Sequence, residues 1–188
     1  MGNGNGNKTW TIPNLLTILR ILITPGFVIA FTYENFTLAW SLFAVAGLSD
    51  GLDGFLARVL RQRSKLGAVL DPLADKILLV ASFVALGWKG WLPVWLVILV
   101  VSRDLIIVGG LVLLNYLGVE GPDRLSPSRI SKCNTLAQIC LVLVTLIWRS
   151  TGIDLHTAVQ MLVLLVAVLT IVSGAVYLKV GSQWLMEK

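Results

Sequence analysis

The sequence predicts an all-α integral membrane protein, because it is strongly apolar and its apolar runs are long and continuous. Of its 188 residues, 56% are hydrophobic and only 13% are charged. A soluble domain of this length could not bury so much apolar surface, since surface-to-volume scaling leaves too many residues exposed. The runs are about as long as a helix that crosses a bilayer, and they lack the alternation of barrel strands.

Six apolar segments are expected to form transmembrane helices, at approximately residues 14–33, 37–59, 66–86, 91–116, 128–148 and 155–178. The first follows an amphipathic lead-in with Trp10 at headgroup level, and no small-residue cleavage site follows it, so we expect an uncleaved helix. A short basic connection joins the second to the third, and the turn GWKGWLP separates the third from the fourth. A polar stretch that ends in a Ser-Pro helix-start signal precedes the fifth.

The first residues are compositionally distinct from the rest. Residues 1–9 begin MGNGNGN and have almost no apolar content, so we expect a flexible tail. Residues 10–188 are expected to form a single six-helix domain, without an internal repeat.

Basic residues predict the orientation of the helices. With the N-terminus inside, every Lys and Arg except Lys89 and Arg149 falls on the inner side or in the inner halves of the helices. Because basic residues are enriched on the cytoplasmic side, we expect both termini there. The basic cluster of residues 58–65 is then cytoplasmic and also suits contact with anionic lipids.

Four carboxylates interrupt the apolar pattern near the cytoplasmic ends of the second and third predicted helices. Asp50 and Asp53 are three residues apart, and Asp71 and Asp75 are four apart, so each pair shares one helix face. A charge near the bilayer centre costs about 2.5–3.5 kcal/mol on insertion scales. Four converging carboxylates need cations, and carboxylate oxygen suits Mg²⁺, Mn²⁺ or Ca²⁺. We expect one or two divalent ions at this position.

Each part of this pattern alone has a structural interpretation. Asp71 before Pro72 is typical of an N-cap followed by Pro at the first helical position. Asp50 and Asp53 could pair with the neighbouring arginines, and the nearby glycines could serve helix packing. The combination is more specific than its parts.

The combined pattern reads D-x-x-D-G-x-x-A-R, then eight residues, then G-x-x-x-D-x-x-x-D. Every fixed position is filled, by Asp50, Asp53, Gly54, Ala57, Arg58, Gly67, Asp71 and Asp75. This pattern resembles the signature of the CDP-alcohol phosphatidyltransferase family. The resemblance implies a six-helix membrane enzyme, commonly a homodimer, that moves a phosphatidyl group from CDP-diacylglycerol to an acceptor hydroxyl and releases CMP.

The resemblance also implies a role for each residue of the signature. The four aspartates would form a two-metal site (Mg²⁺ or Mn²⁺), with Asp75 also the general base. Gly54, Ala57, Arg58 and Gly67 would bind the cytidine diphosphate part of the donor. The chemistry suits these residues independently, because a pyrophosphate under attack needs its charge neutralised and the acceptor hydroxyl needs a base.

Resemblance beyond the signature concerns the acceptor. IPNLLTILRI at 12–21 and DPLADKILL at 71–79 resemble the branch of phosphatidylglycerophosphate synthases and eukaryotic-type cardiolipin synthases. SRDLIIVGG at 102–110 and ISKCNTLAQ at 130–138 are more similar to the cardiolipin synthases. We therefore expect phosphatidylglycerol as acceptor, with glycerol 3-phosphate as the alternative.

Three residues outside the signature are expected to contact the phosphate of the acceptor, namely Arg103, Lys132 and Asn134. Arg103 and Asp104 form a charged pair inside a predicted membrane helix, which by default indicates a functional site. The other interpretation of this pair is a mutual ion pair that fixes helix packing.

Other functional classes explain less of the sequence. A divalent-ion transporter should carry polar groups along a whole pathway, whereas the outer halves of the predicted helices are nearly free of charge. We expect an integral protein of a bacterial inner membrane, with the active site facing the cytoplasm and no nucleic-acid partner. Cys133 and Cys140 are expected to be reduced core residues.

Overall fold

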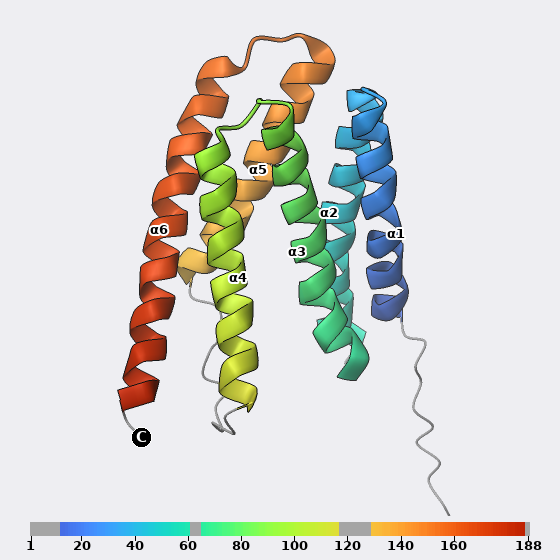
Figure 1. Cartoon of the computed structure of the whole chain (residues 1–188). Coiled ribbons are helices and arrows are strands. Elements are labelled where there is room, and N and C mark those ends of the chain that lie inside the picture. The colour runs from blue at the N-terminus through green and yellow to red at the C-terminus, as the bar shows by residue number, and fades with distance from the viewer. Residues whose placement is uncertain (1–11, 61–64, 117–128, 187–188) are drawn as a thin grey trace, which may run out of the picture. The chain divides into compact units, whose positions relative to one another are not determined.

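The computed structural model describes residues 12–60, 65–116 and 129–186, and these residues form six α-helices and no strand (Figure 1). The helices are α1 (Ile12–Thr32), α2 (Phe36–Leu60), α3 (Lys65–Trp88), α4 (Val94–Tyr116), α5 (Arg129–Thr151) and α6 (His156–Met186). The all-α prediction is therefore confirmed for this part of the chain. The predicted tail at residues 1–9 lies outside the described residues, as do residues 61–64 of the basic connection.

The helix boundaries agree with the predicted ranges to within a few residues, with one larger difference. Helix α6 continues to Met186, whereas the apolar pattern predicted an end near residue 178. The additional residues include lysine, serine and glutamine, which hydropathy excludes from a span but which a helix accommodates. Hydropathy thus located the end of the apolar surface and not the end of the helix.

A glycine ends α3. Gly90 has a φ of 70°, the left-handed conformation that a residue with a Cβ adopts at a cost. The Trp91 N–H donates to the Leu86 carbonyl at 3.0 Å, and the Gly90 N–H donates to the Gly87 carbonyl at 2.9 Å. These two bonds form a Schellman motif, which satisfies carbonyls at the end of the helix.

The end of α1 has the same pair of bonds without a glycine. Glu34 occupies the left-handed position with a φ of 60°. The Asn35 N–H donates to the Ala30 carbonyl at 2.9 Å, and the Glu34 N–H donates to the Phe31 carbonyl at 3.1 Å. Asn35 then caps α2, because its Oδ1 accepts the Leu38 N–H at 3.1 Å. The connection between α1 and α2 is therefore short and is held by backbone bonds together with the side-chain cap of Asn35.

The chain divides into two compact units, and the division falls within α3. The first unit contains residues up to Ser82 together with Arg149–Thr151, and the second contains Phe83–Trp148 and Gly152–Lys188. The single domain predicted for residues 10–188 stays a prediction.

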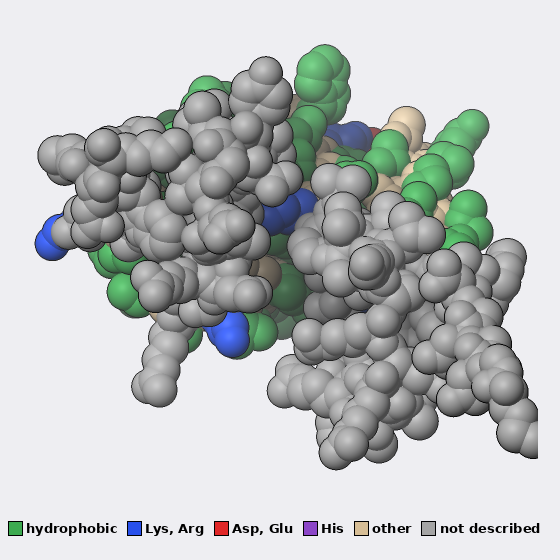
Figure 2. Space-filling view, turned by 90° about the horizontal axis from the view of Figure 1, so that it is seen from below, with side chains coloured by type: hydrophobic (Ala, Val, Ile, Leu, Met, Phe, Trp, Pro, Cys, Tyr) green, Lys and Arg blue, Asp and Glu red, His purple; other side chains and the backbone are tan. Residues whose placement is uncertain are grey.

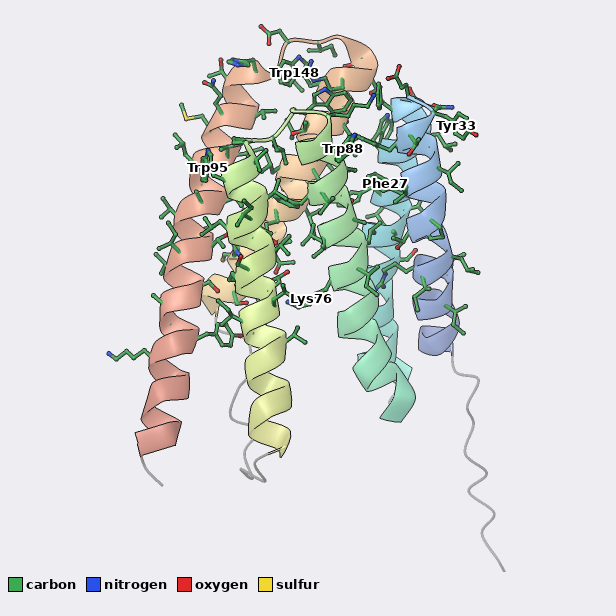
Figure 3. The ribbon with its side chains drawn as sticks, in the orientation of Figure 1. Phe27, Tyr33, Lys76, Trp88, Trp95 and Trp148 are labelled. Carbon is green, nitrogen blue, oxygen red and sulfur yellow. The ribbon has the colours of Figure 1, made fainter. Side chains whose placement is uncertain are left out.

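In the first unit, α1 packs against α2 through aromatic rings. Phe27 is fully buried, and its ring centroid lies 6.0 Å from that of Phe31 and 6.0 Å from that of Phe43 (Figure 3). Aromatic pairs at this separation contribute beyond their buried area. Ala39 and Ala46 on α2 are also fully buried, and their small side chains allow the two helices to approach.

In the second unit, α4 packs against α6. Leu96 and Val100 on α4, Leu141 and Leu146 on α5, and Val166 on α6 are essentially inaccessible to solvent. Gly87, near the end of α3, allows close approach of α4, because a Cβ at residue 87 would lie 2.8 Å from Cγ2 of Val97. A side chain at this position would force Val97 to move.

Apolar side chains also cover much of the exterior. Many large hydrophobic side chains are exposed, and most described side chains visible in Figure 2 are hydrophobic. Among the described residues, Ile130–Thr151 and His156–Tyr177 are long and apolar enough to cross a membrane. These features indicate association with a membrane.

The expectation that Cys133 and Cys140 are core residues is wrong, because both are exposed free thiols. Their spacing of seven does place them on one face of α5. The buried face of that helix is a different one, formed by Asn134, Leu141 and Thr145 among others.

Candidate active site

The signature residues belong to two consecutive helices. The C-terminal part of α2 contains Asp50, Asp53, Gly54, Ala57 and Arg58, and the N-terminal part of α3 contains Gly67, Asp71 and Asp75. Both segments flank the connection at residues 61–64, as the sequence predicted. The side chains of these eight residues lie outside the described residues, so their convergence stays a prediction.

Helix continuity excludes one structural interpretation of the acidic residues. Helix α3 begins at Lys65, so Asp71 lies inside it and is not its N-cap. Helix α2 is unbroken from Phe36 to Leu60. Within each helix, the two aspartate positions are therefore about one turn apart on one face.

Buried residues one turn away indicate which faces these are. On α2, Ala46 and Ser49 are buried, and positions 50 and 53 each follow one of them by four residues. On α3, Leu78, Leu79 and Ser82 are buried, and position 75 precedes Leu79 by four residues. Because residues four apart lie on the same side of a helix, positions 50 and 53 of α2 and position 75 of α3 lie on the same sides of their helices as these buried residues.

A second group of polar residues lies in the interior of the other unit, around Arg103 on α4. Only 6% of Arg103 is exposed. Its Nη1 donates to Asp104 Oδ1 at 2.7 Å, and its Nη2 donates to Ser131 Oγ on α5 at 2.6 Å and to Ser173 Oγ on α6 at 2.5 Å. The guanidinium also lies 5.8 Å from the centre of the Tyr177 ring. Arg103 therefore links three helices.

Asn134 belongs to the same group. It is fully buried on α5, and its Oδ1 accepts a hydrogen bond from Thr170 Oγ1 on α6 at 3.0 Å. It lies one turn beyond Ser131, the partner of Arg103, and one turn before Gln138, which is 1% exposed. We call Arg103, Ser131, Asn134, Gln138, Thr170 and Ser173 the polar layer, with Asp104 as the counter-ion of Arg103.

Of the three residues predicted to contact the acceptor, two belong to the polar layer and one does not. Arg103 and Asn134 both belong to the polar layer, whereas the side chain of Lys132 is exposed on α5. The hydrogen bonds of Arg103 to Ser131 on α5 and to Ser173 on α6 show that Arg103 also has a packing role. The role of all three in acceptor binding stays a prediction.

Sequence reasoning missed the other members of the polar layer. Ser131, Asn134 and Gln138 recur at intervals of three and four in an apolar helix, which is the period of a helix face. That spacing would have identified a buried polar face on α5. Thr170 and Ser173 on α6 have no comparable pattern, because single hydroxyl residues are common in apolar helices.

Comparison with known proteins adds independent information. A sequence profile of the family described as CDP-alcohol phosphatidyltransferase matches residues 10–175. Human cardiolipin synthase (CMP-forming) is 40% identical over 151 residues, which are 73% of this chain and 50% of the human protein. The CDP-diacylglycerol–glycerol-3-phosphate 3-phosphatidyltransferase of Cereibacter sphaeroides is 37% identical over 153 residues, or 77% of this chain and 66% of that protein.

A relative with the same printed name, from Haemophilus influenzae, is 35% identical over 184 residues. That match covers 95% of this chain and 97% of the relative. By contrast, the chain spans about half the length of the curated cardiolipin synthases from human and rat. The similar proteins thus include relatives named for two different activities.

Proposed function

Because the chain belongs to the CDP-alcohol phosphatidyltransferase family, we propose that it transfers a phosphatidyl group from CDP-diacylglycerol to an acceptor hydroxyl and releases CMP. The complete signature supports this proposal. The observation that carries it is that each aspartate pair lies on an unbroken helix, with its two positions about one turn apart on one face. Carboxylates in an otherwise apolar helix are poorly placed to serve only solubility.

The proposed reaction exchanges one phosphorus–oxygen bond for another. The acceptor oxygen attacks the phosphorus that bears diacylglycerol, and the bond from this phosphorus to the bridging oxygen of the pyrophosphate breaks. CMP leaves with the bridging oxygen, and Asp75 takes the proton of the acceptor hydroxyl. A carboxylate within hydrogen-bond reach of the hydroxyl contributes about 10²–10⁴-fold when it acts as a general base.

The donor set of the signature fits divalent metal ions. Four carboxylates at same-face positions of two helices supply the oxygen ligands that Mg²⁺ and Mn²⁺ prefer, so Asp50, Asp53, Asp71 and Asp75 would hold two such ions. Bound there, the metals supply positive charge for the pyrophosphate. Gly54, Ala57, Arg58 and Gly67 would hold the cytidine diphosphate, where glycine and alanine leave room for it and Arg58 pairs with a phosphate.

For the acceptor we propose phosphatidylglycerol, which makes the product cardiolipin. The support is the similarity of segments 102–110 and 130–138 to cardiolipin synthases, and the human relative of that name. Glycerol 3-phosphate is the second candidate, because two bacterial relatives are named for it. Arg103, Lys132 and Asn134 would contact the acceptor.

We further propose that the six helices cross a bacterial inner membrane with both termini and the active site on the cytoplasmic side. The positions of Tyr33, Trp88 and Trp148 along the chain support this topology. Tyr33 directly follows α1, Trp88 is the last residue of α3, and Trp148 lies in the last turn of α5. These helix ends share the outer side in the proposed topology. Trp88 is 89% exposed, as expected of an aromatic side chain at a membrane interface. A homodimer is proposed from the family alone.

The test is release of CMP by purified protein supplied with CDP-diacylglycerol, Mg²⁺ or Mn²⁺, and one acceptor at a time. We expect release that depends on metal and on acceptor, with phosphatidylglycerol giving a higher rate than glycerol 3-phosphate under identical donor conditions. A higher rate with glycerol 3-phosphate would overturn the assignment of the acceptor. No release with any acceptor would overturn the proposed reaction.

A further inference from the structure

Arg20 is a buried cation in the first unit that neither the signature nor the polar layer includes. It lies in α1, and its side chain is 1% exposed. Arginine is almost never fully buried unless negative charge accompanies it, because a cation that is removed from water needs compensation. The location of Arg20 therefore indicates where negative charge gathers in this unit.

Arg20 belongs to the face of α1 that packs on α2. Thr24, Phe27 and Phe31 follow it by four, seven and eleven residues and are also buried, so the four residues share one face of α1. Phe27 from this face packs against Phe43 of α2, with the ring centroids 6.0 Å apart. Arg20 is therefore buried on the side of α1 that faces α2.

The register between the two helices sets the level of Arg20. A short connection joins α1 to α2, and the helices run antiparallel (Figure 1). Arg20 precedes Phe27 by seven residues, and position 50 follows Phe43 by seven. Each is therefore about two helical turns, or roughly 10 Å, from the contact between the two rings, in the same direction. Position 50 also lies on the same side of α2 as the buried Ala46, four residues before it. Arg20 and Asp50 thus lie at the same level of the helix pair.

The charges of the proposed site suggest a use for this cation. Four carboxylates carry four negative charges and two divalent ions carry four positive ones, so aspartates and metals balance. The pyrophosphate of CDP-diacylglycerol adds two negative charges, one on each phosphate. Arg58 of the signature can neutralise one of them. Arg20 supplies a second positive charge, from a helix that the signature does not include.

The positions of the two arginines differ in depth. Arg58 lies eight residues beyond position 50, or roughly 12 Å nearer to the cytoplasmic end of α2 in the proposed topology. That end suits the nucleotide, whereas the level of Asp50 suits the phosphate that carries the lipid. A guanidinium can engage two oxygens of a phosphate at once, and burial strengthens the attraction because water is excluded.

A permanent ion pair between Arg20 and Asp50 is the alternative. Such a pair would engage carboxylate oxygens that the proposed metal site needs, and it would leave one cation for the two phosphates of the donor. The two roles also predict different losses on substitution. A phosphate ligand affects only molecules that carry the phosphate, whereas a partner of Asp50 affects the metal site and therefore every nucleotide that binds through it.

We propose that Arg20 binds the diacylglycerol-bearing phosphate of the donor. This inference rests on the proposed function, since the donor is the substrate of that reaction. It makes Arg20 a donor-binding residue contributed by α1, in addition to those of α2 and α3. Its charge lies beside the phosphate that is transferred, where it would offset the negative charge of the oxygens while the bond to CMP breaks.

The test compares binding of CDP and of CMP to the purified protein in detergent with Mn²⁺, by isothermal titration calorimetry. The two nucleotides differ in one phosphate, which is the one that carries diacylglycerol in the donor. We expect Arg20→Met to weaken binding of CDP by about tenfold or more, as the loss of hydrogen bonds to a charged group allows. Binding of CMP should stay within about twofold of the wild type, because CMP lacks this phosphate.

Thr24→Val is the matched control. Thr24 lies one turn beyond Arg20 on the same buried face, and its hydroxyl donates to the Arg20 carbonyl at 3.0 Å. This variant removes a polar group from the interface of α1 and α2 but keeps the guanidinium, so it should bind both nucleotides as the wild type does. Arg20→Lys is the second variant, for use if Arg20→Met does not fold. It should weaken binding of CDP more than binding of CMP, because lysine lacks the planar fork.

Nucleotide binding is measured without an acceptor and does not depend on turnover. Selective loss of CDP affinity in Arg20→Met supports the phosphate site even if no acceptor gives release of CMP, an outcome that would overturn the proposed reaction alone. If CMP is released but both Arg20 variants bind CDP as tightly as the wild type, the inference is wrong and the proposed function stands. Equal weakening of CDP and CMP, or a higher Mn²⁺ requirement for both, would show that Arg20 acts through the metal site and would also overturn the inference. A wild type that binds neither nucleotide would overturn both proposals.

Discussion

The α2–α3 signature and the polar layer both place charged groups in apolar helices, but they do so in different ways. The signature concentrates four acidic residues between positions 50 and 75, and in the proposed site these carboxylates would require cations from outside the chain. The polar layer draws its members from three helices between positions 103 and 173, and its one cation is neutralised by the adjacent Asp104.

This difference suits the signature to catalysis and the polar layer to recognition of the acceptor. A region with unbalanced charge is suited to bind metal ions and a pyrophosphate, whereas a balanced region of amides and hydroxyls is suited to select a polar head group. Substitutions in the two regions should therefore have different effects on activity and stability. In the signature, activity should be lost with little change in stability, and in the polar layer, stability and acceptor choice should change.

The largest effect is expected at the proposed base. Asp75→Asn should lower kcat by about 10³-fold or more, because the group that takes the acceptor proton is lost while most metal ligands remain. Binding of CDP-diacylglycerol should be largely retained, which equilibrium binding of the donor measures. Asp154→Asn, which alters the exposed carboxylate that accepts the His156 N–H at 2.9 Å, is the control and should be fully active. A near-normal rate for Asp75→Asn would show that Asp75 is not the base.

The next effect is expected in the polar layer and concerns stability. Arg103→Met should lower the free energy of unfolding by about 3–5 kcal/mol, because it removes the buried cation that pairs with Asp104 at 2.7 Å. The double variant Arg103→Met, Asp104→Leu should recover most of this loss, since apolar replacement of a whole buried pair is often neutral. Denaturant unfolding in detergent measures both. A single variant as stable as the wild type would contradict a clamp between α4, α5 and α6.

A smaller effect is expected at a metal ligand. Asp50→Ala should raise the Mg²⁺ concentration needed for half-maximal activity by about tenfold or more, since one carboxylate is removed from the shared set. Ser49→Ala is the neighbouring control, because the Ser49 hydroxyl donates to the Val45 carbonyl of its own helix at 2.7 Å. An unchanged metal titration for Asp50→Ala would contradict the shared site.

The smallest effects are expected outside both regions, at the two helix ends with left-handed residues. Glu34→Gly should raise the free energy of unfolding by about 0.5–1 kcal/mol, as strain at a φ of 60° is relieved. Gly90→Ala should lower it by about 1 kcal/mol, although a Cβ there meets no atom within 4 Å. Activity should not change in either variant. Opposite signs would show that contacts, not backbone conformation, decide the stability of these turns.

Much of the fold could be predicted because helix formation in an apolar chain depends on local features. Continuous apolar runs predicted six helices, and turn residues such as Gly90 predicted where α3 ends. The left-handed Glu34 was not predictable, since nothing in its residue type favours that conformation. The end of α6 was missed because lysine and glutamine are polar but still helix-forming.

The residues of the candidate site were likewise predictable only where their role depends on local spacing. The spacing of Asp50, Asp53, Asp71 and Asp75 is a local property, so the sequence by itself determined which residues share a helix face and which family the signature resembles. Thr170 and Ser173 were not predictable, because a single hydroxyl residue in an apolar helix is distinguished only by its burial and its hydrogen-bond partners.

The sequence by itself determined the all-α class, the helix order and the acidic signature, because each depends on interactions between residues a few positions apart. Only the tertiary structure decided that Arg103 clamps three helices, that Cys133 and Cys140 are exposed, and that Gln138 Nε2 is buried without a hydrogen bond among the described residues. The physical reason is that burial and hydrogen-bond pairing are properties of packed helices, and these bring together residues that are distant along the chain.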